Sequence, residues 1–492
     1  MMLLLPLLLL LLLLSAVEAA TAAATGPAAQ PPPPLPARLP PFTWDTVQTF
    51  IHGCQCDRVL LNATQLQYVT RYNLAVVEKG HGSADTAGGG GLLKGDYTIP
   101  ALGKQLKQRK PDMFVLFYQN PVLDFLLSDV HTLAMAAEKA GETDIYAKNT
   151  DGSYSMNFVN KTNPVGGACS KEAQNYPAGV RIYNMSAPSM RKIFIDQCVK
   201  ATHTGGIDGC HIDRANWAEV KCAHSSAQNG NHSHQGTVLE WTPAQELQMA
   251  TAEKQLLGGL QAAVGEDMLI SAKENPTVGL MTDWMYTNTQ YIEDCWMQGY
   301  NVLKGNRPSN KTVQVIHACA LPPQLPATTT VLGRYSCACC LFGAVLLSEL
   351  AAASAAVARG QVLLAHGCGP TEPAERLAPG CLHGDCIHEF NFTLASFLIV
   401  AGNHSFYSYA SNALDGSAMG PGAWEFRSYK EKWWPAYQQP LGPPKGLGVR
   451  GWRSPETGKY FDEVYTRGFA HADVWMNVQT RNGLIHWHAA AV

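Results

Sequence analysis

Short apolar runs alternate with helical patterns through most of this chain, and this alternation constrains the fold more than any other feature. Strands that alternate with helices lie parallel, because each helix returns the chain to the start of the next strand. Eight runs fit such strands: Thr49 to Gly53, Leu74 to Glu78, Met113 to Tyr118, Gly206 to Asp213, Met268 to Ala272, Gln290 to Glu293, Val313 to His317 and Phe406 to Tyr409. About eight such units predict an α/β fold, a closed (β/α)8 barrel of the TIM type rather than an open sheet.

One of the intervening helices is marked both at its start and along its buried face. Ser186 can cap it, and Pro188 suits its first turn because the amide hydrogen that proline lacks has no partner there. Residues then recur at the spacing of an amphipathic helix: Met190, Ile193, Phe194, Gln197 and Cys198. The sequence therefore predicts a helix directly before the Gly206 to Asp213 strand.

The apolar segment from Leu341 to Ala365 has two interpretations. It is apolar enough to resemble a membrane helix, but Glu349 and Arg359 interrupt it and Gly360 breaks the run. We favour a buried helix followed by a strand from Gln361 to Ala365. A strand there means that one of the eight assignments above is wrong.

The amino-terminal residues have the features of a secretory signal peptide. Leu3 to Leu14 is an almost pure leucine run, shorter than the roughly 20 apolar residues that a membrane span needs. Val17 and Ala19 can fill the small-residue positions before a signal-peptidase cut. We therefore expect residues 1–20 to be removed, and the mature protein to be secreted or held in the endomembrane lumen without an integral membrane span. An uncleaved membrane anchor is the alternative.

Glycosylation signals and cysteine content agree with export. The chain has 14 cysteines, an even number, as expected for disulfide pairing outside the cytosol. The acceptor pattern N-x-S/T occurs at Asn62, Asn160, Asn184, Asn231, Asn310, Asn391 and Asn403. Asn391 lies in an apolar run, where a glycan could be excluded.

Composition divides the rest of the chain into three parts. Residues 21–42 are rich in Ala and then Pro and cannot bury enough apolar surface to fold, which predicts an extended linker. The predicted barrel, the catalytic domain, occupies residues 43–415. Residues 416–492 are expected to form a short C-terminal β extension that packs on the barrel.

Charge and motifs restrict the class of function. The formal net charge is -3 and no Lys/Arg run is longer than a pair, which predicts neither nucleic acid nor an anionic membrane as a partner. The sequence has no G-x-S-x-G elbow, no P-loop and no G-x-G-x-x-G after a strand. Lipase, nucleotide hydrolase and dinucleotide enzyme assignments therefore have no support, and we expect no cofactor.

The segment from Gly205 to Asn216 is where we most expect chemistry. A helix precedes it, a glycine turn introduces it, and a polar stretch follows Asp213. The C-terminal ends of barrel strands carry the catalytic groups, so Asp213 is expected to point into the barrel mouth. Its alternative role is a salt bridge or helix cap. Asp208, at the strand's entry, is expected to be a turn or cap residue.

Several blocks of the chain resemble TIM-barrel glycoside hydrolases of unassigned substrate, known as hypothetical glycosyl hydrolase-like proteins. The segment from Gly206 to Asp213 is similar to their fourth-strand motif, "G-hydrophobic-D-G-x-hydrophobic-hydrophobic-D", which ends in an essential acid. His211 departs from this motif at one apolar position, and Asn184 stands where an Asp often occurs. Further similar blocks lie at residues 180–191, 392–407, 434–446 and 467–477. The resemblance spans most of residues 45–487 and implies a barrel that cleaves O-glycosidic bonds of a carbohydrate or polysaccharide.

Glycosidic bond cleavage normally uses two carboxyl groups, one as acid and one as nucleophile or base. By analogy with the fourth-strand acid, we assign Asp213 as nucleophile or base. Glu293 looks like the family's later-strand "hydrophobic-E" position and is our candidate for the acid. Glu274, which follows the preceding apolar strand, is its rival, and an ordinary loop carboxylate is the alternative for each.

Sugar rings bind to aromatic platforms and planar polar side chains. Suitable residues near the predicted strand ends are Tyr118, Gln119, Asn120, Trp217, Trp284 and Tyr286. Core packing is the alternative role for the aromatic ones.

Two other classes of protein fit parts of the sequence. The Cys381 to His388 segment has the spacing of zinc ligands, as in a metal-dependent deacetylase-like hydrolase, although disulfides are the favoured explanation and we expect no metal site. A non-catalytic carbohydrate-binding barrel would keep the fold and the aromatics but lack an acid pair.

Overall fold

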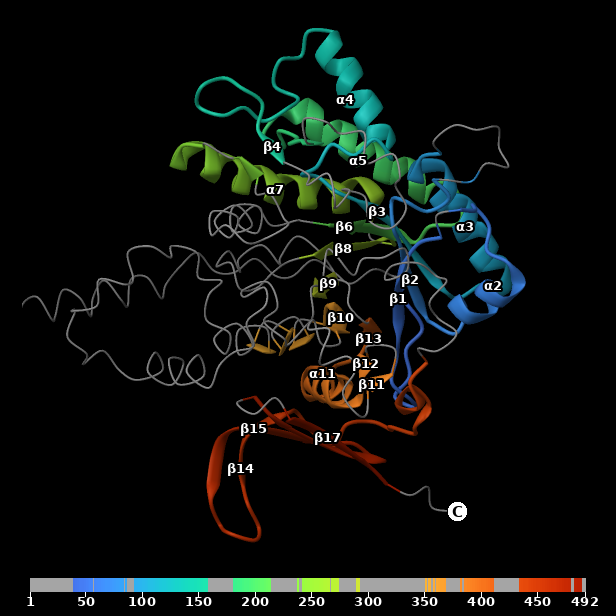
Figure 1. Ribbon diagram of the computed structural model, residues 1–492, viewed down its shortest axis with the longest axis vertical. Coiled ribbons are helices and arrows are strands. Elements are labelled where there is room, and N and C mark those ends of the chain that lie inside the picture. Colours follow the sequence, from blue (N-terminus) through green and yellow to red (C-terminus); the bar gives the residue numbers. More distant parts are fainter. Residues whose placement is uncertain are drawn as a thin grey trace, which may run out of the picture.

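Eight parallel strands form the centre of the molecule (Figure 1). The computed structural model describes residues 39–55, 57–83, 85, 93–157, 180–213, 237–238, 241–265, 267–273, 289–292, 360–368, 381–382, 385–410, 433–478 and 482–488, together with a few positions between 350 and 358. In the order in which they pair, the strands are β1 (Phe50–Gly53), β2 (Leu74–Val77), β3 (Phe114–Gln119), β6 (Gly209–Ile212), β8 (Leu269–Lys273), β9 (Thr289–Ile292), β10 (Val362–Cys368) and β13 (Ser405–Ala410). All neighbouring pairs are parallel, which confirms the prediction from strand-helix alternation.

Seven of the eight predicted runs contain strands of this sheet. The run from Val313 to His317 lies outside the described residues. The remaining strand is β10, which begins beside Gln361 as the second interpretation of the 341–365 segment predicted. The described positions between 350 and 358 are helical and precede β10, in agreement with that interpretation.

The first and last strands of the pairing order lie next to each other. Thr49 and Tyr407 form a parallel bridge, and the Tyr407 amide donates to the Gln48 carbonyl at 2.9 Å. One fully buried cluster joins side chains of β1 and β13, the first and last strands of the pairing order, with side chains of β2, β3, β8 and β10. Its members are Phe50, Leu74, Val76, Phe114, Leu116, Leu269, Val362, Leu364 and Phe406. These side chains share one face of the sheet, opposite the helices.

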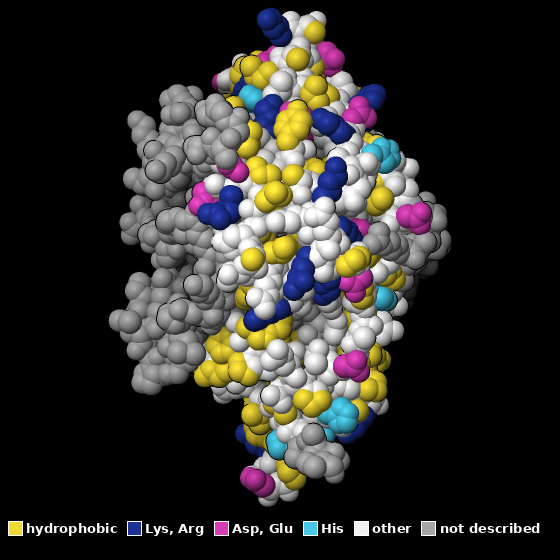
Figure 2. Space-filling model, turned by 90° about the vertical axis from the view of Figure 1, so that its right-hand side faces the viewer, with side chains coloured by type: hydrophobic (Ala, Val, Ile, Leu, Met, Phe, Trp, Pro, Cys, Tyr) yellow, Lys and Arg dark blue, Asp and Glu magenta, His cyan; other side chains and the backbone are white. Residues whose placement is uncertain are grey.

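Helices cover the other face of the sheet (Figure 1). They are α2 (Ala63–Val69), α3 (Gly95–Arg109), α4 (Asp129–Lys139), α5 (Pro188–Thr202), α7 (Pro243–Val264) and α11 (Ile387–Val400). A second core cluster joins α2, α3, α5 and α7 to the outward-facing residues of β2, β3, β6 and β8. Figure 2, which faces the right-hand side of Figure 1, shows basic, acidic and hydrophobic side chains interspersed over this part of the surface.

Helix α5 confirms the predicted apolar face but not the predicted cap. Met190, Phe194 and Cys198 are fully buried. Pro188 begins the helix, but its N-cap is Ala187, which makes no side-chain cap bond. The Ser186 hydroxyl instead donates to the Asn184 side chain at 2.6 Å, so the cap assignment was wrong.

A buried disulfide fastens α5 to the sheet. Cys198 of α5 and Cys210 of β6 are bonded, with a separation of 12 residues along the chain. Both side chains are fully buried in the helix-side core. Because β6 ends next to Asp213, the bond anchors the strand that carries the candidate acid.

The C-terminal region forms an antiparallel sheet, as expected for a β extension. Its strands are β14 (Val449–Arg453), β15 (Tyr460–Gly468), β16 (Ala472–Asn477) and β17 (Asn482–Trp487), preceded by the 3-10 helix η10 (Pro435–Gln438). The sheet packs on α11 through a third core cluster. A Cβ on Gly483 would lie 2.6 Å from the Asn391 carbonyl oxygen, so only glycine permits this close approach of β17 to α11.

Two small sheets complete the described structure. One joins β5 (Val180–Arg181), β4 (Met156–Asn157) and β7 (Thr237–Val238), and the other pairs β11 (Cys381–Leu382) with β12 (Asp385–Cys386). Within the described ranges, no helix has the length and hydropathy of a membrane span.

Candidate active site

Asp213 follows β6 directly, and its backbone amide donates to the Gln119 carbonyl at the end of β3 at 2.8 Å. The alternation of β6 explains its direction. Cys210 and Ile212 pack into the helix-side core, so His211 and Asp213 belong to the opposite face of the sheet. Asp213 therefore lies at the C-terminal end of the parallel strands and faces away from the helices, as the sequence predicted.

Two side chains from the end of β3 donate hydrogen bonds to the same Asp213 oxygen. The Tyr118 hydroxyl donates to Oδ2, and Asn120 Nδ2 donates to it at 2.9 Å. The amide of Asn120 is itself oriented, because its oxygen accepts from the backbone amides of Val122 and Leu123, each at 2.9 Å. Both side chains are almost fully buried. They thus form a fixed cradle for the carboxylate.

The third residue of the predicted β3 group points elsewhere. Gln119 is buried, and its Nε2 donates to the Phe194 carbonyl of α5 at 3.4 Å. This direction takes its side chain to the helix side of the sheet. Tyr118 and Asn120 are therefore brought together with Asp213, whereas Gln119 is not.

A charged group at the ends of β1 and β2 adjoins this cradle. Lys79 Nζ donates to the Tyr118 hydroxyl at 3.3 Å and to Glu78 Oε2 at 2.8 Å. Glu78 Oε1 lies 3.0 Å from His52 Nε2. Glu78 and Lys79 are only 16% and 14% exposed, so both charges interact in partial shelter from water.

These contacts determine which groups carry protons. Burial alone would raise the pKa of Glu78, but Lys79 and His52 outweigh it and lower the pKa of Glu78 to about 2. Burial and the negative charges of Asp213 and Glu78 hold the pKa of Tyr118 well above its ordinary value. Glu78 is therefore a carboxylate at neutral pH, and Tyr118 remains a hydrogen-bond donor.

Next to the charged group, polar side chains of β1, β3, β6 and β8 lie close together on the face of the sheet that holds Asp213. The rings of His52 and His211 are 5.4 Å apart, and the Tyr118 ring lies 6.0 Å from that of His211. His211 Nδ1 is 3.1 Å from the Ser271 hydroxyl of β8, and both side chains are fully buried. This contact accounts for a histidine at a position where the sequence pattern expects an apolar residue.

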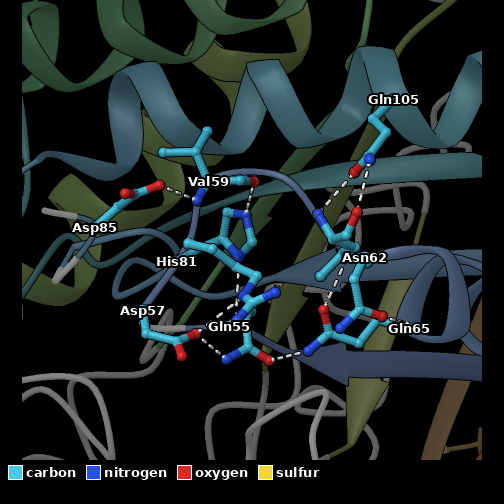
Figure 3. Close-up of polar contacts among 10 residues, drawn as sticks. Gln55, Asp57, Val59, Asn62, Gln65, His81, Asp85 and Gln105 are labelled. Atoms are coloured by element: carbon cyan, nitrogen blue, oxygen red, sulfur yellow. Dashed lines mark hydrogen bonds and ion pairs between the residues drawn. The ribbon is translucent and has the colours of Figure 1, made fainter. Parts of the chain in front are cut away.

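The loops that follow β1 and β2 are fastened to each other by hydrogen bonds (Figure 3). His81 accepts a hydrogen bond from the Gln55 amide at Nδ1, at 3.0 Å, and donates from Nε2 to the Val59 carbonyl at 2.7 Å. The Val59 amide in turn donates to Asp85 at 2.8 Å. Lys79 is only two residues from His81, so this network supports the position of the charged group.

Five predicted site residues lie outside the described residues: Glu274, Glu293, Trp217, Trp284 and Tyr286. The two glutamates nevertheless follow described strands directly, since β8 ends at Lys273 and β9 ends at Ile292. In the pairing order β8 is the neighbour of β6, and β9 is the next strand.

Sequence reasoning missed His52, Glu78 and Lys79. The signal was present, because Glu78 ends the predicted second strand and Lys79 follows it. The rule that places functional groups at the C-terminal ends of barrel strands applies to them as it does to Asp213. Asp208, by contrast, has a structural role, but not the turn or cap that the sequence predicted: it accepts from the Val115 amide of β3 at 2.8 Å and pairs with Lys107 at 2.5 Å.

Among the described residues, no group of three or more His, Cys, Asp or Glu side chains is placed to hold a metal ion. In the Cys381 to His388 segment, Cys381 and Cys386 are directly opposite each other in the β11–β12 pair. Opposed residues of an antiparallel pair have Cα atoms about 4.5–5.5 Å apart, within the range of disulfides. The backbone register thus fits the disulfide explanation of this segment.

Comparison with known proteins gives a family match over most of the chain. The family model described as hypothetical glycosyl hydrolase family 15 matches residues 107–473. No curated protein matches the chain. Solved structures resemble it weakly. The glycoside hydrolase domain of PelA from Pseudomonas aeruginosa is 12% identical, over 74% of this chain and 95% of that one, with a TM-score of 0.34. The α-amylase of Geobacillus thermoleovorans is 10% identical, over 88% and 87% of the two chains, with a TM-score of 0.42.

Proposed function

This chain belongs to the hypothetical glycosyl hydrolase family 15, and from this premise we propose that it cleaves O-glycosidic bonds of a carbohydrate or polysaccharide with Asp213 as nucleophile or base. The observation that carries the proposal is the cradle of Asp213. A carboxylate that accepts two side-chain hydrogen bonds at the end of a central strand is held in one orientation, as a nucleophile or base requires.

We propose that the eight-stranded sheet closes into a (β/α)8 barrel. The bridge between Thr49 and Tyr407 supports closure, and so does the buried cluster that joins Phe50, Leu269 and Phe406 on one face of the sheet. Layers of this kind fill the interior of TIM barrels. In a closed barrel, the ends of β1, β2, β3 and β6 surround one mouth, which collects Glu78, Lys79 and Asp213 there.

The reaction needs a second carboxyl group that is protonated when the substrate binds. Glu78 does not fit this role, because it is ion-paired and stays ionised at neutral pH. We therefore keep Glu293 as the proposed acid, with Glu274 as its rival. Glu293 is preferred because it resembles the family's later-strand "hydrophobic-E" position and directly follows β9, two strands from β6 in the pairing order.

The test begins with a panel of polysaccharides and aryl glycosides, scored by the release of reducing sugar or phenol. Asp213→Asn should lower kcat by roughly 10²–10⁴-fold or more while leaving the thermal unfolding midpoint close to that of the wild type. Asp196→Asn is the matched control, because Asp196 is an exposed carboxylate on α5. Undiminished hydrolysis by Asp213→Asn would reject the assigned site.

The acid is identified by its dependence on the leaving group. A variant that lacks the general acid should hydrolyse natural glycosides slowly, yet retain most of its activity on glycosides with acidic phenol leaving groups, which need no proton. We expect this pattern for Glu293→Gln and not for Glu274→Gln. The reverse pattern would transfer the role to Glu274. If neither variant changes hydrolysis, the two-carboxylate mechanism with these residues is wrong.

The second candidate function is that of a non-catalytic carbohydrate-binding barrel. The charged and aromatic groups around Tyr118 favour it, because such groups can bind a sugar without catalysing its hydrolysis. The panel of polysaccharides and aryl glycosides distinguishes the hydrolase from the binding protein. Binding without any hydrolysis, in a protein whose Asp213→Asn variant binds equally well, would support the second candidate.

We also propose that the protein is exported after signal-peptide cleavage and carries N-linked glycans at Asn62 and Asn403. Both are exposed: Asn62 caps α2 through its side-chain oxygen, and the side-chain oxygen of Asn403 accepts from Trp44 at 3.1 Å. The amide nitrogen that would carry the sugar is not the capping atom. Asn391 is different, because it lies within α11 and its acceptor residue Thr393 is fully buried.

Peptide mapping after enzymatic removal of N-glycans in heavy-oxygen water tests this proposal. We expect conversion of Asn62 and Asn403 to labelled Asp, and none at Asn391. The first residue of the mature protein should follow Ala19 or Ala20. A labelled Asn391, or an intact leucine run at the amino terminus, would contradict it.

A further inference from the structure

Lys79 begins a chain of hydrogen bonds that ends on Asp213. Its ammonium group donates to the Tyr118 hydroxyl oxygen at 3.3 Å, and this hydroxyl donates to Asp213 Oδ2. An ammonium group can only donate, and an ionised carboxylate can only accept. The direction of both bonds is therefore fixed, and Tyr118 must present its hydrogen to Asp213.

The position of Lys79 is held from several sides. Its ammonium group bonds Glu78 at 2.8 Å and lies 4.4 Å from the centre of the Tyr118 ring and 4.8 Å from that of Phe125. Cation–π contacts of this length in a sheltered site are attractive. Only 14% of the side chain is exposed, so water does not compete strongly for the ammonium group.

We propose that Lys79 is a positioning residue for the proposed hydrolysis and that, through the Tyr118 hydroxyl, it holds Asp213 as an oriented carboxylate. The role of Asp213 rests on the proposed function, but the chain of hydrogen bonds does not. A donor that itself accepts a bond from a cation is polarised and donates more strongly. The Lys79 charge therefore reaches Asp213 through the same oxygen that receives the Asn120 bond.

Among the described side chains, three other titratable groups face this chain of hydrogen bonds. They are His52 of β1, Glu78 directly after β2, and His211 of β6. Glu78 contacts Lys79, whereas the donors to Asp213 are Tyr118 and Asn120. Because the pKa of Glu78 is about 2, Glu78 stays a carboxylate through the range in which aspartate carboxyls ordinarily titrate.

The experiment measures the pKa of Asp213 directly in the full mature chain. Carbon NMR of protein labelled at the aspartate carboxyl carbon is recorded across a pH titration, and Asp213→Asn assigns the resonance. Lys79→Met should raise the pKa of Asp213 by about one pH unit or more, since an opposite charge within about 4–6 Å lowers a carboxyl pKa by one to three units. Lys79→Arg should restore most of the wild-type value. Lys104→Met, an exposed lysine of α3, is the matched control and should leave it unchanged.

The route of the effect is tested by combination with Tyr118→Phe, which removes the hydroxyl but keeps the ring. In that background, Lys79→Met should shift the Asp213 pKa clearly less than in the wild type. An equal shift would overturn the route through Tyr118, and an unchanged Asp213 in Lys79→Met would overturn the proposal. If Lys79→Met does not fold, Lys79→Gln, which removes the charge but can still donate a hydrogen bond, replaces it under the same criteria.

The result is separable from the proposed function. If the wild type hydrolyses no glycoside but the shift occurs, the positioning role stands and the hydrolase assignment fails. With an active enzyme, Lys79→Met should move the acid limb of the kcat/KM profile upward by the same amount as the NMR titration. A loss of activity without that movement would indicate a merely structural role and reject the proposal.

Discussion

The environment of each side chain decides what it does at the candidate site. Tyr118 and Asn120 were expected from sequence to contact sugar, and the structure places both of them on Asp213. Gln119, between them, points to α5 because successive residues of a strand face opposite sides. The period of two in the sequence was enough to predict this separation, but it did not tell which of the two faces held the site.

His81 is a residue whose protonation state should couple folding to pH. Burial lowers the pKa of His81 to about 4, and its Nδ1 accepts the Gln55 amide (Figure 3), so a proton there would oppose that bond. In the unfolded chain the pKa is near 6.5. In the unfolded state His81 therefore binds a proton below about pH 6.5, whereas in the folded state it binds one only near pH 4.

The stability contributed by neutral His81 is fully present above pH 6.5 and is lost as the pH falls toward 4. The slope is about 1.36 kcal/mol per pH unit, which amounts to about 3 kcal/mol over the interval. We expect His81→Asn to lower the free energy of unfolding at pH 7 but to lose less on acidification to pH 4.5 than the wild type does. Urea unfolding at several pH values measures both. His203→Asn, an exposed control, should keep the wild-type slope, and an equally steep slope in His81→Asn would contradict the assignment.

At the scale of elements, alternation and composition predicted most of the central sheet. The described strands are short and largely apolar, and helices lie between most successive strands of the sheet. The cap of α5 was predicted wrongly, since Ser186 bonds Asn184 rather than the helix and Ala187 takes the cap position. Local hydrogen bonding of a serine with a nearby side chain cannot be distinguished from capping by residue type alone.

The disulfide between α5 and β6 should contribute substantially to stability. A loop of 12 residues closed by a disulfide is worth about 3 kcal/mol of unfolding free energy in the chain-entropy model. We expect the Cys198→Ala/Cys210→Ala variant to be less stable than the wild type by that amount in urea unfolding without reductant. Both positions are buried and alanine fits without new polar groups, so the fold should persist.

Reductant provides the control for this prediction. It acts on any other disulfide in both proteins, but on the Cys198–Cys210 bond only in the wild type. The difference in stability between the two proteins should therefore close to within about 1 kcal/mol when the bonds are reduced. A difference that persists unchanged in reductant would mean that packing, and not the cross-link, causes it.

At the scale of the whole molecule, the sequence predicted a C-terminal β extension that packs on the barrel, but not how the two are joined. The C-terminal sheet packs against α11, and Gly483 permits the close contact. The block that begins at Arg467 was one of those that resembled the family, yet no local pattern explained the arginine. Its role depends on carbonyl groups more than 60 residues earlier in the chain, and such a long-range contact has no local sequence signal.

Arg467 joins the C-terminal sheet to α11 by bonding the carbonyls at the end of that helix. Its guanidinium donates to the carbonyls of Leu398, Ile399 and Ala401 at 2.9, 3.3 and 2.5 Å. These belong to the last turn of the helix and the residue after it, where carbonyls have no partner within the helix and the helix dipole favours a cation. From the other edge of the group, Nε donates to the Gly446 carbonyl at 2.9 Å. Burial lowers the pKa of Arg467 to about 10, so the charge is kept at neutral pH.

Arg467→Met should therefore be strongly destabilising, although methionine fills much of the same space. It leaves several buried carbonyls without a donor, and a loss of about 3 kcal/mol in unfolding free energy is expected. Arg467→Lys should lie between the two proteins, because an ammonium group is a single point donor and cannot span the helix end and Gly446 together. Arg453→Met, an exposed arginine of β14, is the matched control and should change stability by less than about 0.5 kcal/mol. Urea unfolding at pH 7 tests this prediction: equal stabilities of the two methionine variants would show that the C-terminal sheet is held to α11 by its apolar contacts alone.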